Sequence, residues 1–343
     1  MSITFLIFYI ANAYKVILIQ FVVCEAVTRY IVTHTDVDGV AAAALYTYLT
    51  KESAVVIFTE PYSLRKELYK VYRKRPVKVV VLDLSPNSDA IDFIVGVIEL
   101  LRERGGSTIW LDHHVWEAEW AERLRDAGAE LYVDRSTCAT GVVAKYIKPS
   151  TNSVDWRFVE ELVKGVCGAD LWKFDHPLSP FFMRLVRRGD EDSWRLYVYN
   201  TLAKGIMQVR EFEERVAERF AEEVEELSKH MQVKVFEVNG IRMAIVEKNE
   251  KVENSILAAR VMGFTMADIV AVVDRSGKIS LRSRGVNVRD LALALGGGGH
   301  AQAAGAKIAI PLSVKLAGIF NNKALIEYVE YMLKEHANYI KRL

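Results

Sequence analysis

Short apolar runs alternate with longer helical stretches in the first half of the chain. Three runs, at residues 30–33, 77–82 and 107–111, each end in polar residues. Uninterrupted runs of this kind are typical of buried strands in a parallel sheet, and the stretches at 40–49 and 91–104 have the pattern of crossover helices. The first half therefore predicts an α/β domain, whose ligands bind beyond the carboxyl ends of the strands.

A second pattern begins with residues 210–230, which are rich in Glu with interleaved Arg and Lys. This composition predicts a solvated helix that joins two domains. Beyond it, residues 255–262 predict a helix, and four short apolar runs predict strands at 233–236, 243–246, 269–273 and 279–282. The second part is therefore expected to be a smaller, mixed α+β domain.

These patterns divide the chain into four parts. The parts are a hydrophobic N-terminal extension (1–26), a parallel-sheet domain (27–195), a helical linker (196–232) and the mixed α+β domain (233–343). The length of 343 residues agrees with two domains of ordinary size.

The composition is that of a globular protein, with 51% hydrophobic and 26% charged residues. It excludes a disordered, a collagen-like and a disulfide-scaffold protein. The net charge of +1 excludes a global attraction to nucleic acid, so any such surface must be local. From residue 275 onward, basic residues outnumber acidic ones by seven, which places the basic surface in the second domain.

The three cysteines Cys24, Cys138 and Cys167 are odd in number and widely spaced. The spacing argues against a disulfide framework and a thiolate zinc site, and favours the reducing cytoplasm. Cys138 and Cys167 are expected to be buried small hydrophobes.

The first 23 residues carry a single charge, Lys15, and would be long enough to cross a bilayer as a helix. They lack a basic start and a cleavage site, so a secretory signal is not expected. Polar residues also interrupt the segment, namely Ser2, Thr4, Asn12 and Gln20. Three interpretations stay open: an extension outside the functional fold, a membrane anchor, and a packed extra element.

Imidazole and carboxylate side chains follow several of the predicted strands. His34, Asp36 and Asp38 occupy alternate positions directly after one strand, and alternate side chains in an extended chain share a face. The other groups are Asp83, Asp112-His113-His114 and Asp170. A lone aspartate at such a place is usually a turn or helix cap. Four groups at one sheet edge instead predict a catalytic metal site.

The donor set has no thiolate, which favours manganese, cobalt, magnesium or zinc over an iron–sulfur cluster. Four carboxylates offset the charge of two divalent cations; they are Asp36, Asp38, Asp83 and Asp170. Two such cations activate a water for attack on phosphorus.

The second domain contains a glycine run, residues 296–299, followed by His300. Its backbone N–H groups can approach a phosphate or a base closely. The run matches neither the Walker nor the Rossmann pattern. With Arg282 and Arg284 nearby in the sequence, it predicts an anion-binding clamp.

These motifs together resemble the DHH phosphoesterases over roughly residues 27–312, with Asp112-His113-His114 as the naming triplet. The glycine run ending in His300 is similar to the signature of the accessory DHHA1 domain, which the pyrophosphatase branch of the family lacks. The resemblance implies a DHH catalytic domain at 27–195 and a DHHA1 substrate-binding domain at 233–343.

The resemblance also implies roles for individual residues, with manganese as the usual metal. One metal would be held by His34, Asp36 and Asp83, and the other by Asp38, Asp83, His113 and Asp170. Asp112 would fix a neighbouring imidazole, and His114 would face the scissile phosphate. The substrate would be gripped by Arg282, Gly297, Gly298, Gly299 and His300.

Some assignments near these motifs have alternatives. Asp175 and His176 are substitutes for Asp170 if the fourth motif is aligned differently. Trp110, Trp116 and Trp120 are expected in the core or at an interface rather than as base-stacking platforms, and Trp172-Lys173-Phe174 is a candidate entrance for a base.

The leading hypothesis is a manganese-dependent phosphodiesterase similar to RecJ and nanoRNase. It would degrade single-stranded DNA or short RNA exonucleolytically to mononucleotides, using two divalent cations, with Mg²⁺ or Co²⁺ as alternatives to Mn²⁺. The alternative is a small-nucleotide enzyme, either a 3′-phosphoadenosine 5′-phosphate phosphatase or a cyclic-dinucleotide phosphodiesterase. A third hypothesis is a replication-associated protein similar to the RecJ-like partners of GINS. A homodimer stays open, and a membrane partner is not expected.

Overall fold

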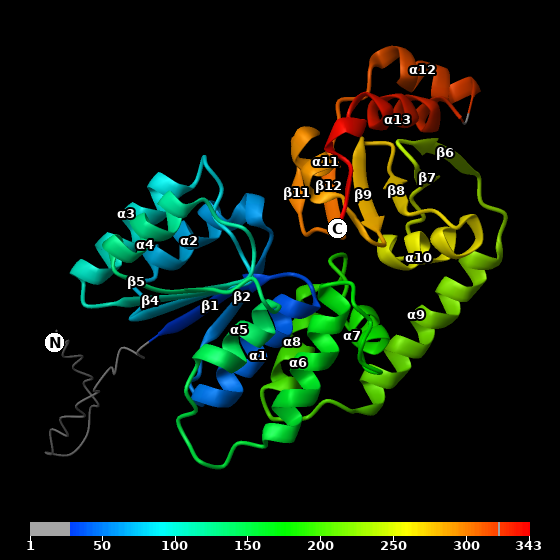
Figure 1. Ribbon diagram of the computed structural model, residues 1–343. Coiled ribbons are helices and arrows are strands. Elements are labelled where there is room, and N and C mark those ends of the chain that lie inside the picture. Colours follow the sequence, from blue (N-terminus) through cyan, green and yellow to red (C-terminus); the bar gives the residue numbers. More distant parts are fainter. Residues whose placement is uncertain (1–27, 322) are drawn as a thin grey trace, which may run out of the picture.

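The computed structural model describes residues 28–321 and 323–343. They form two α/β units joined by one long helix (Figure 1). The N-terminal extension, including Cys24, lies outside the described residues, so its three interpretations stay open. Within the described ranges, no helix is both long and apolar enough to cross a membrane.

The first unit is built on a five-stranded parallel sheet in the order β2-β1-β3-β4-β5. Its strands are β1 (Arg29–His34), β2 (Val55–Thr59), β3 (Lys78–Leu82), β4 (Ser107–Asp112) and β5 (Ala129–Val133). The strands predicted at 30–33, 77–82 and 107–111 are confirmed as β1, β3 and β4. The predicted α/β class is therefore confirmed.

Helices cover both faces of this sheet (Figure 1). On one face lie α2 (Leu64–Arg73), α3 (Ile91–Glu103) and α4 (Ala118–Ala127). On the other face lie α1 (Val37–Thr50), α5 (Ala139–Tyr146), α6 (Trp156–Asp170), α7 (Ser179–Leu185) and α8 (Asp192–Leu202). In β1, Ile31 packs into the α1 core and Val32 into the α2 core. Covering both faces requires strands that are apolar at every position, which is why the runs are uninterrupted.

The strand order reverses at β1, which pairs with β2 on one side and with β3 on the other. In open parallel sheets a crevice forms at such a reversal, beyond the carboxyl ends of the strands. His34 is the last residue of β1, and Asp83 directly follows β3. The fold therefore brings two of the predicted metal ligands to this crevice.

The linker helix is α9 (Arg210–Ser228). It was expected to be solvated, but Arg219 and Glu223 are buried, so this expectation is wrong for one face of the helix. Glu223 accepts hydrogen bonds from the guanidinium groups of Arg184 and Arg187. These contacts fasten the linker to the end of α7 and the loop that follows it.

The second unit has a six-stranded sheet in the order β11-β12-β9-β8-β7-β6. Its strands are β6 (Val233–Val238), β7 (Ile241–Glu247), β8 (Ile269–Val273), β9 (Lys278–Ser283), β11 (Gly298–Gly299) and β12 (Ala303–Lys307). Only β7 and β8 pair in parallel, which confirms the predicted mixed α+β domain. Its helices are α10 (Asn254–Thr265), α11 (Arg289–Ala294), α12 (Leu312–Phe320) and α13 (Ala324–Glu335), and β10 (Val286–Asn287) pairs with β13 (Lys341–Arg342).

Cys138 and Cys167 form a disulfide between the start of α5 and the end of α6. The prediction that both are free hydrophobes is therefore wrong, although Cys138 is buried as expected. The helices α5 and α6, which follow the last strand of the sheet, lie side by side and bring together cysteines that are 29 positions apart. The cysteines therefore no longer favour a reducing compartment.

Candidate metal centre and substrate cleft

The first motif bends where it was expected to be extended. His34 ends β1, and Asp36 caps the N-terminus of α1, where its carboxylate accepts a hydrogen bond from the backbone N–H of Gly39. A Cβ at position 39 would lie 2.6 Å from the carbonyl oxygen of His34, so the turn requires glycine there. Asp38 therefore lies in the first turn of the helix, and the alternation argument for one shared face is wrong.

The turn gives the three side chains of the motif two different neighbourhoods. His34 Nδ1 lies 2.9 Å from Asp36 Oδ2 and 3.4 Å from Asp83 Oδ2. Burial by itself lowers the pKa of His34, but the charge of Asp36 and hydrogen bonding to Asp36, Asp83 and Glu60 together raise that pKa. His34, Asp36 and Asp83 thus form one candidate metal cluster, whose donor atoms lie within 4.8 Å of one another.

A second cluster lies on the other side of Asp83. His113 Nε2 lies 3.2 Å from Asp83 Oδ1, 3.6 Å from Asp170 Oδ2 and 3.7 Å from Asp38 Oδ2. Asp83 therefore turns one oxygen toward each cluster. Its backbone φ of 55° is unusual for a residue other than glycine, and such conformations concentrate at functional sites.

Asp38 is held from below by the N-terminus of α5. Its carboxylate accepts hydrogen bonds from the backbone N–H groups of Ala139 (2.7 Å) and Thr140 (2.9 Å) and from the Thr140 hydroxyl (2.6 Å). Burial and the nearby charges of Asp83 and Asp170 nevertheless raise the pKa of Asp38. A buried carboxylate among other carboxylates is stabilised by a cation.

Asp112 lies behind the clusters and orients His114. It is buried; its Oδ1 lies 2.8 Å from His114 Nδ1, and its Oδ2 accepts a 2.6 Å hydrogen bond from Trp116 Nε1. Burial alone raises the pKa of Asp112, but the charge and hydrogen bond of His114, with the charge of His113 and the hydrogen bond of Trp116, lower it to about 2. For His114 burial lowers the pKa, and the charge and hydrogen bond of Asp112, with the charge of Asp83, raise it to about 9. Asp112 thus supports a positively charged His114 at the edge of the site.

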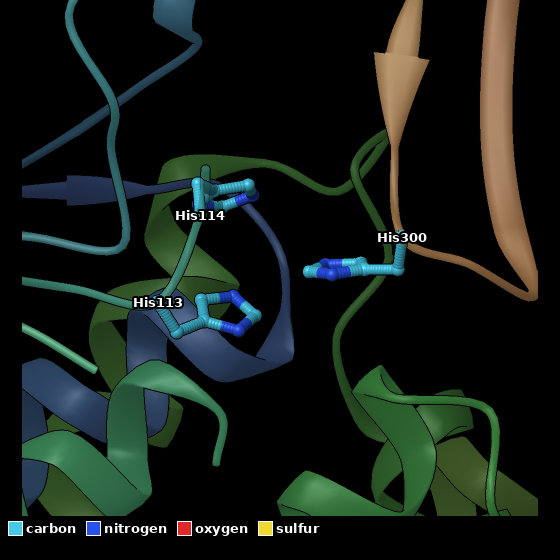
Figure 2. Close-up of side chains that lie close together, drawn as sticks. All are labelled: His113, His114 and His300. Atoms are coloured by element: carbon cyan, nitrogen blue, oxygen red, sulfur yellow. The ribbon is translucent and has the colours of Figure 1, made fainter. Parts of the chain in front are cut away.

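His300 reaches this site from the second unit. Its ring is stacked on that of His113, with centroids 5.1 Å apart, and lies 5.7 Å from that of His114. Figure 2 shows the three imidazoles facing one another across the gap between the units. Burial, together with the charges of His113 and His114, lowers the pKa of His300 to about 4. The site is therefore completed by both units.

The glycine run has a structural reason of its own. Gly298 and Gly299 form β11, which pairs with β12. A Cβ on Gly297 would lie 2.0 Å from the carbonyl oxygen of Gly305, and one on Gly299 would lie 2.6 Å from the Cα of Ala304. The close approach at these two glycines is therefore to the neighbouring strand, and it places His300 at the end of a tight hairpin.

Arg282 lies in β9, and its side chain crosses toward the first unit. Its guanidinium donates a 3.1 Å hydrogen bond to the hydroxyl of Ser255 and lies 5.8 Å from the ring of Trp172. Arg282 also lines a cleft of about 810 Å³ that includes Asp36 and Asp170. The predicted substrate residue and the predicted metal ligands thus share one cleft.

The alternatives for the fourth motif can now be separated. Asp170 faces His113, whereas His176 lies 3.5 Å from Glu161 and lines a different surface pocket. Asp175 is exposed next to Gly168. The geometry favours Asp170 among the three.

Two neighbours of the clusters were not predicted from the sequence. Glu60, which directly follows β2, lies 3.4 Å from His34 Nε2 and accepts a hydrogen bond from the Thr35 hydroxyl. Its position after a strand was the available signal. Trp116 was expected in the core, and it packs there while its indole N–H binds Asp112.

The donor set agrees with hard divalent cations. It consists of carboxylate oxygens and imidazole nitrogens. His34 Nδ1 and Asp170 Oδ2 are buried and make no hydrogen bond within the described residues, although each has a potential partner close by. Buried donor atoms that lie close together but are not aligned for a hydrogen bond are the arrangement expected of ligands that share a cation.

Comparisons with known proteins find two family domains in the chain. The model of the DHH family N-terminal domain matches residues 28–167, and that of the DHHA1 domain matches residues 240–326. No curated protein matches the chain.

Similar solved structures include three bacterial proteins. An uncharacterised protein from Helicobacter pylori G27 is 19% identical, with a TM-score of 0.41 over 89% of this chain and 99% of that one. The pGpG-specific phosphodiesterase PggH from Vibrio cholerae is 16% identical, with a TM-score of 0.48 over 87% and 99%. An exopolyphosphatase-related protein from Bacteroides fragilis is 15% identical, with a TM-score of 0.49 over 90% and 94%.

Proposed function

Because the chain belongs to the DHH family of phosphoesterases and carries a DHHA1 domain, we propose that it is an exonucleolytic phosphodiesterase. Its substrates are single-stranded DNA or short RNA oligonucleotides, and its products are mononucleotides. Manganese is the proposed metal, with magnesium or cobalt as alternatives. The observation that carries the proposal is the position of Asp83, which turns one carboxylate oxygen to each of two adjacent clusters.

The two clusters are proposed to hold two divalent cations with Asp83 as the shared ligand. One cation would be held by His34, Asp36 and Asp83, and the other by Asp38, Asp83, His113 and Asp170. Two divalent cations held by these residues would lower the pKa of a water and set it in line with phosphorus.

The remaining residues would act on the substrate. His114, kept protonated by Asp112, lies where it can donate a hydrogen bond to a non-bridging phosphate oxygen. His300 approaches from the opposite side, and its low pKa makes it a neutral donor or acceptor at pH 7. Arg282 would bind the phosphate as a cation. The glycines 297–299 would support this clamp by placing His300.

The domain division follows from the same assignment. We propose residues 27–195 as the catalytic domain, 196–232 as the linker and 233–343 as the substrate-binding domain. The stacking of His300 on His113 supports a cleft that functions only with both domains in place.

One observation favours the small-nucleotide alternative. Away from the metal clusters, several cations that line the cleft already have carboxylate partners, as in the pairs Lys248–Glu250 and Arg219–Asp190. A long strand needs unpaired cations along its backbone. The cleft is therefore suited to short substrates, and the described residues add no support for a replication partner or a homodimer.

A substrate panel tests the proposal. Product release with Mn²⁺ is measured for a dinucleotide, a twenty-nucleotide single-stranded DNA and RNA, a cyclic dinucleotide and 3′-phosphoadenosine 5′-phosphate. Conversion of the linear substrates to mononucleotides supports the exonuclease. Turnover of only the small nucleotides supports the alternative, and turnover of none contradicts both.

A further inference from the structure

Arg188 places an exposed guanidinium beside the metal clusters. It belongs to the loop between α7 and α8, and its side chain is 66% exposed within the cleft. Its one ion pair within the described residues is a 3.6 Å approach to Asp36 Oδ2. The negative charges of Asp36, Glu60, Asp83 and Asp170 raise its pKa. Arg188 is therefore a permanent cation at the mouth of the site.

Neighbouring arginines that line the same cleft form ion pairs with carboxylates outside the metal clusters. Arg187 binds Glu223 at 2.5 Å and approaches Glu253, and Arg219 binds the carboxylate of Asp190. These pairs hold the loop and the linker helix together. Arg188 takes no part in that network through its side chain, so its guanidinium is available to a ligand.

The loop that carries Arg188 is fixed to the metal motif by buried Arg195. The guanidinium of Arg195 donates hydrogen bonds to the carbonyl oxygens of Arg188 (2.6 Å) and Asp190 (2.5 Å). It also donates a 2.7 Å bond to the carbonyl oxygen of Thr35, between two of the candidate metal ligands. The backbone of Arg188 is therefore held in a fixed position relative to His34 and Asp36. A group that contacts a reacting phosphate must be positioned in this way.

Arg188 and Arg282 line the same cleft from the two units. Burial and the charge of Arg188 lower the pKa of Arg282 to about 10. Two cations that repel each other across a gap are stabilised by an anion between them. A phosphate that reaches the metal clusters through this cleft enters that gap.

We propose that Arg188 is a catalytic residue that binds the scissile phosphoryl group from the first unit, opposite Arg282. This inference rests on the proposed function, because it assigns the phosphate to the same site. Arg188 would neutralise the charge that develops on the non-bridging oxygens, as arginines do in phosphoryl transfer. It lies outside every motif recognised in the sequence.

The test compares Arg188→Ala and Arg188→Lys with the wild-type protein and with Lys278→Ala. Lys278 is an exposed cation that lines the same cleft in the second unit, so its variant controls for a general loss of positive charge. Turnover of a dinucleotide with Mn²⁺, Mn²⁺ affinity by titration calorimetry and thermal stability are measured for each. The wild-type protein and Asp83→Asn are run in parallel, so that failure of the proposed function is seen separately.

We expect Arg188→Ala to lower kcat roughly 10²-fold to 10³-fold. The variant Arg188→Lys should keep part of the lost activity, and Lys278→Ala should change kcat little. Mn²⁺ affinity should not fall, since the lost group is a cation beside a carboxylate. Guanidinium ion at about 50 mM should restore part of the activity of Arg188→Ala only. An active wild-type protein with Arg188→Ala within about threefold of it, or with activity lost together with Mn²⁺ binding, would overturn the inference.

Discussion

The two walls of the site place different groups next to its centre. The first wall holds the two acidic clusters, and three of their members, Asp38, Asp83 and His113, are at most 2% exposed. The second wall offers Arg282, which lines the cleft, and His300, which stacks on His113; both are partly exposed, and Glu250, Glu253 and Asp274 also line the cleft on this side. The difference shows how the work is divided: one wall is suited to holding cations, and the other to an anionic substrate.

The largest loss of activity is expected when the residue proposed as the shared ligand of both clusters is replaced. Asp83→Asn keeps the size of the side chain but removes its charge, so we expect turnover to fall by roughly 10³-fold or more. We also expect the Mn²⁺-dependent rise in thermal stability to be lost. Asp89→Asn, at an exposed position in the loop after β3, is the matched control. Full activity in Asp83→Asn would contradict the bridging assignment.

The second wall should fail in a different way. His300→Ala removes an imidazole that stacks on His113 and groups with His113 and His114, but has no carboxylate in its group, so we expect turnover to fall roughly 10²-fold while Mn²⁺ affinity is unchanged. Steady-state kinetics and calorimetry on one preparation give both quantities. Loss of Mn²⁺ binding would show that His300 is itself a metal ligand, which would contradict the difference between the two walls.

A smaller effect is expected from a residue that supports the first wall. Glu60→Gln weakens the carboxylate contact of His34 Nε2 while keeping its shape. Such partners of metal ligands typically change metal affinity by about 10-fold to 100-fold, and we expect the lower end because Glu60 is partly exposed. Calorimetry with Mn²⁺ measures it. An unchanged affinity would show that Glu60 supports only Thr35.

The smallest effect on turnover is expected at the disulfide. The double variant Cys138→Ala/Cys167→Ala opens a link between α5 and α6, which lie behind the first wall. We expect turnover within about twofold of wild type and a loss of about 3 kcal/mol of unfolding free energy.

Denaturant titration under oxidising and reducing conditions measures this stability. The reduced wild-type protein should behave like the double variant. A large loss of turnover would mean that the disulfide also positions Asp38 or Asp170.

The positions of several residues of the first wall could be predicted from the sequence for one physical reason. Strands covered on both faces must be apolar throughout, so His34, Asp83 and Asp112 were recognisable as the polar residues at their ends. The bend at Asp36 was not predicted. The alternation argument assumes that the strand continues through residue 38, whereas Asp36 caps a helix and the strand ends before it. Glu60 was missed because β2 lies at a half-exposed edge of the sheet and its apolar run is short.

Other features depend on contacts between distant segments, which no local pattern contains. The burial of Arg219 and Glu223 depends on α9 packing against the end of α7. The disulfide depends on α5 lying beside α6. The approach of His300 to His113 depends on how two units meet, so the sequence indicated both residues but not their stacking.

The helix α9 that joins the two units also makes their meeting an intramolecular event. Within one chain the contact between the units does not depend on the protein concentration. The two units, if made as separate polypeptides, would have to find each other by diffusion to rebuild the cleft. In the intact chain the specific activity should therefore be independent of dilution, whereas in a mixture of the separate units it should fall with every dilution step.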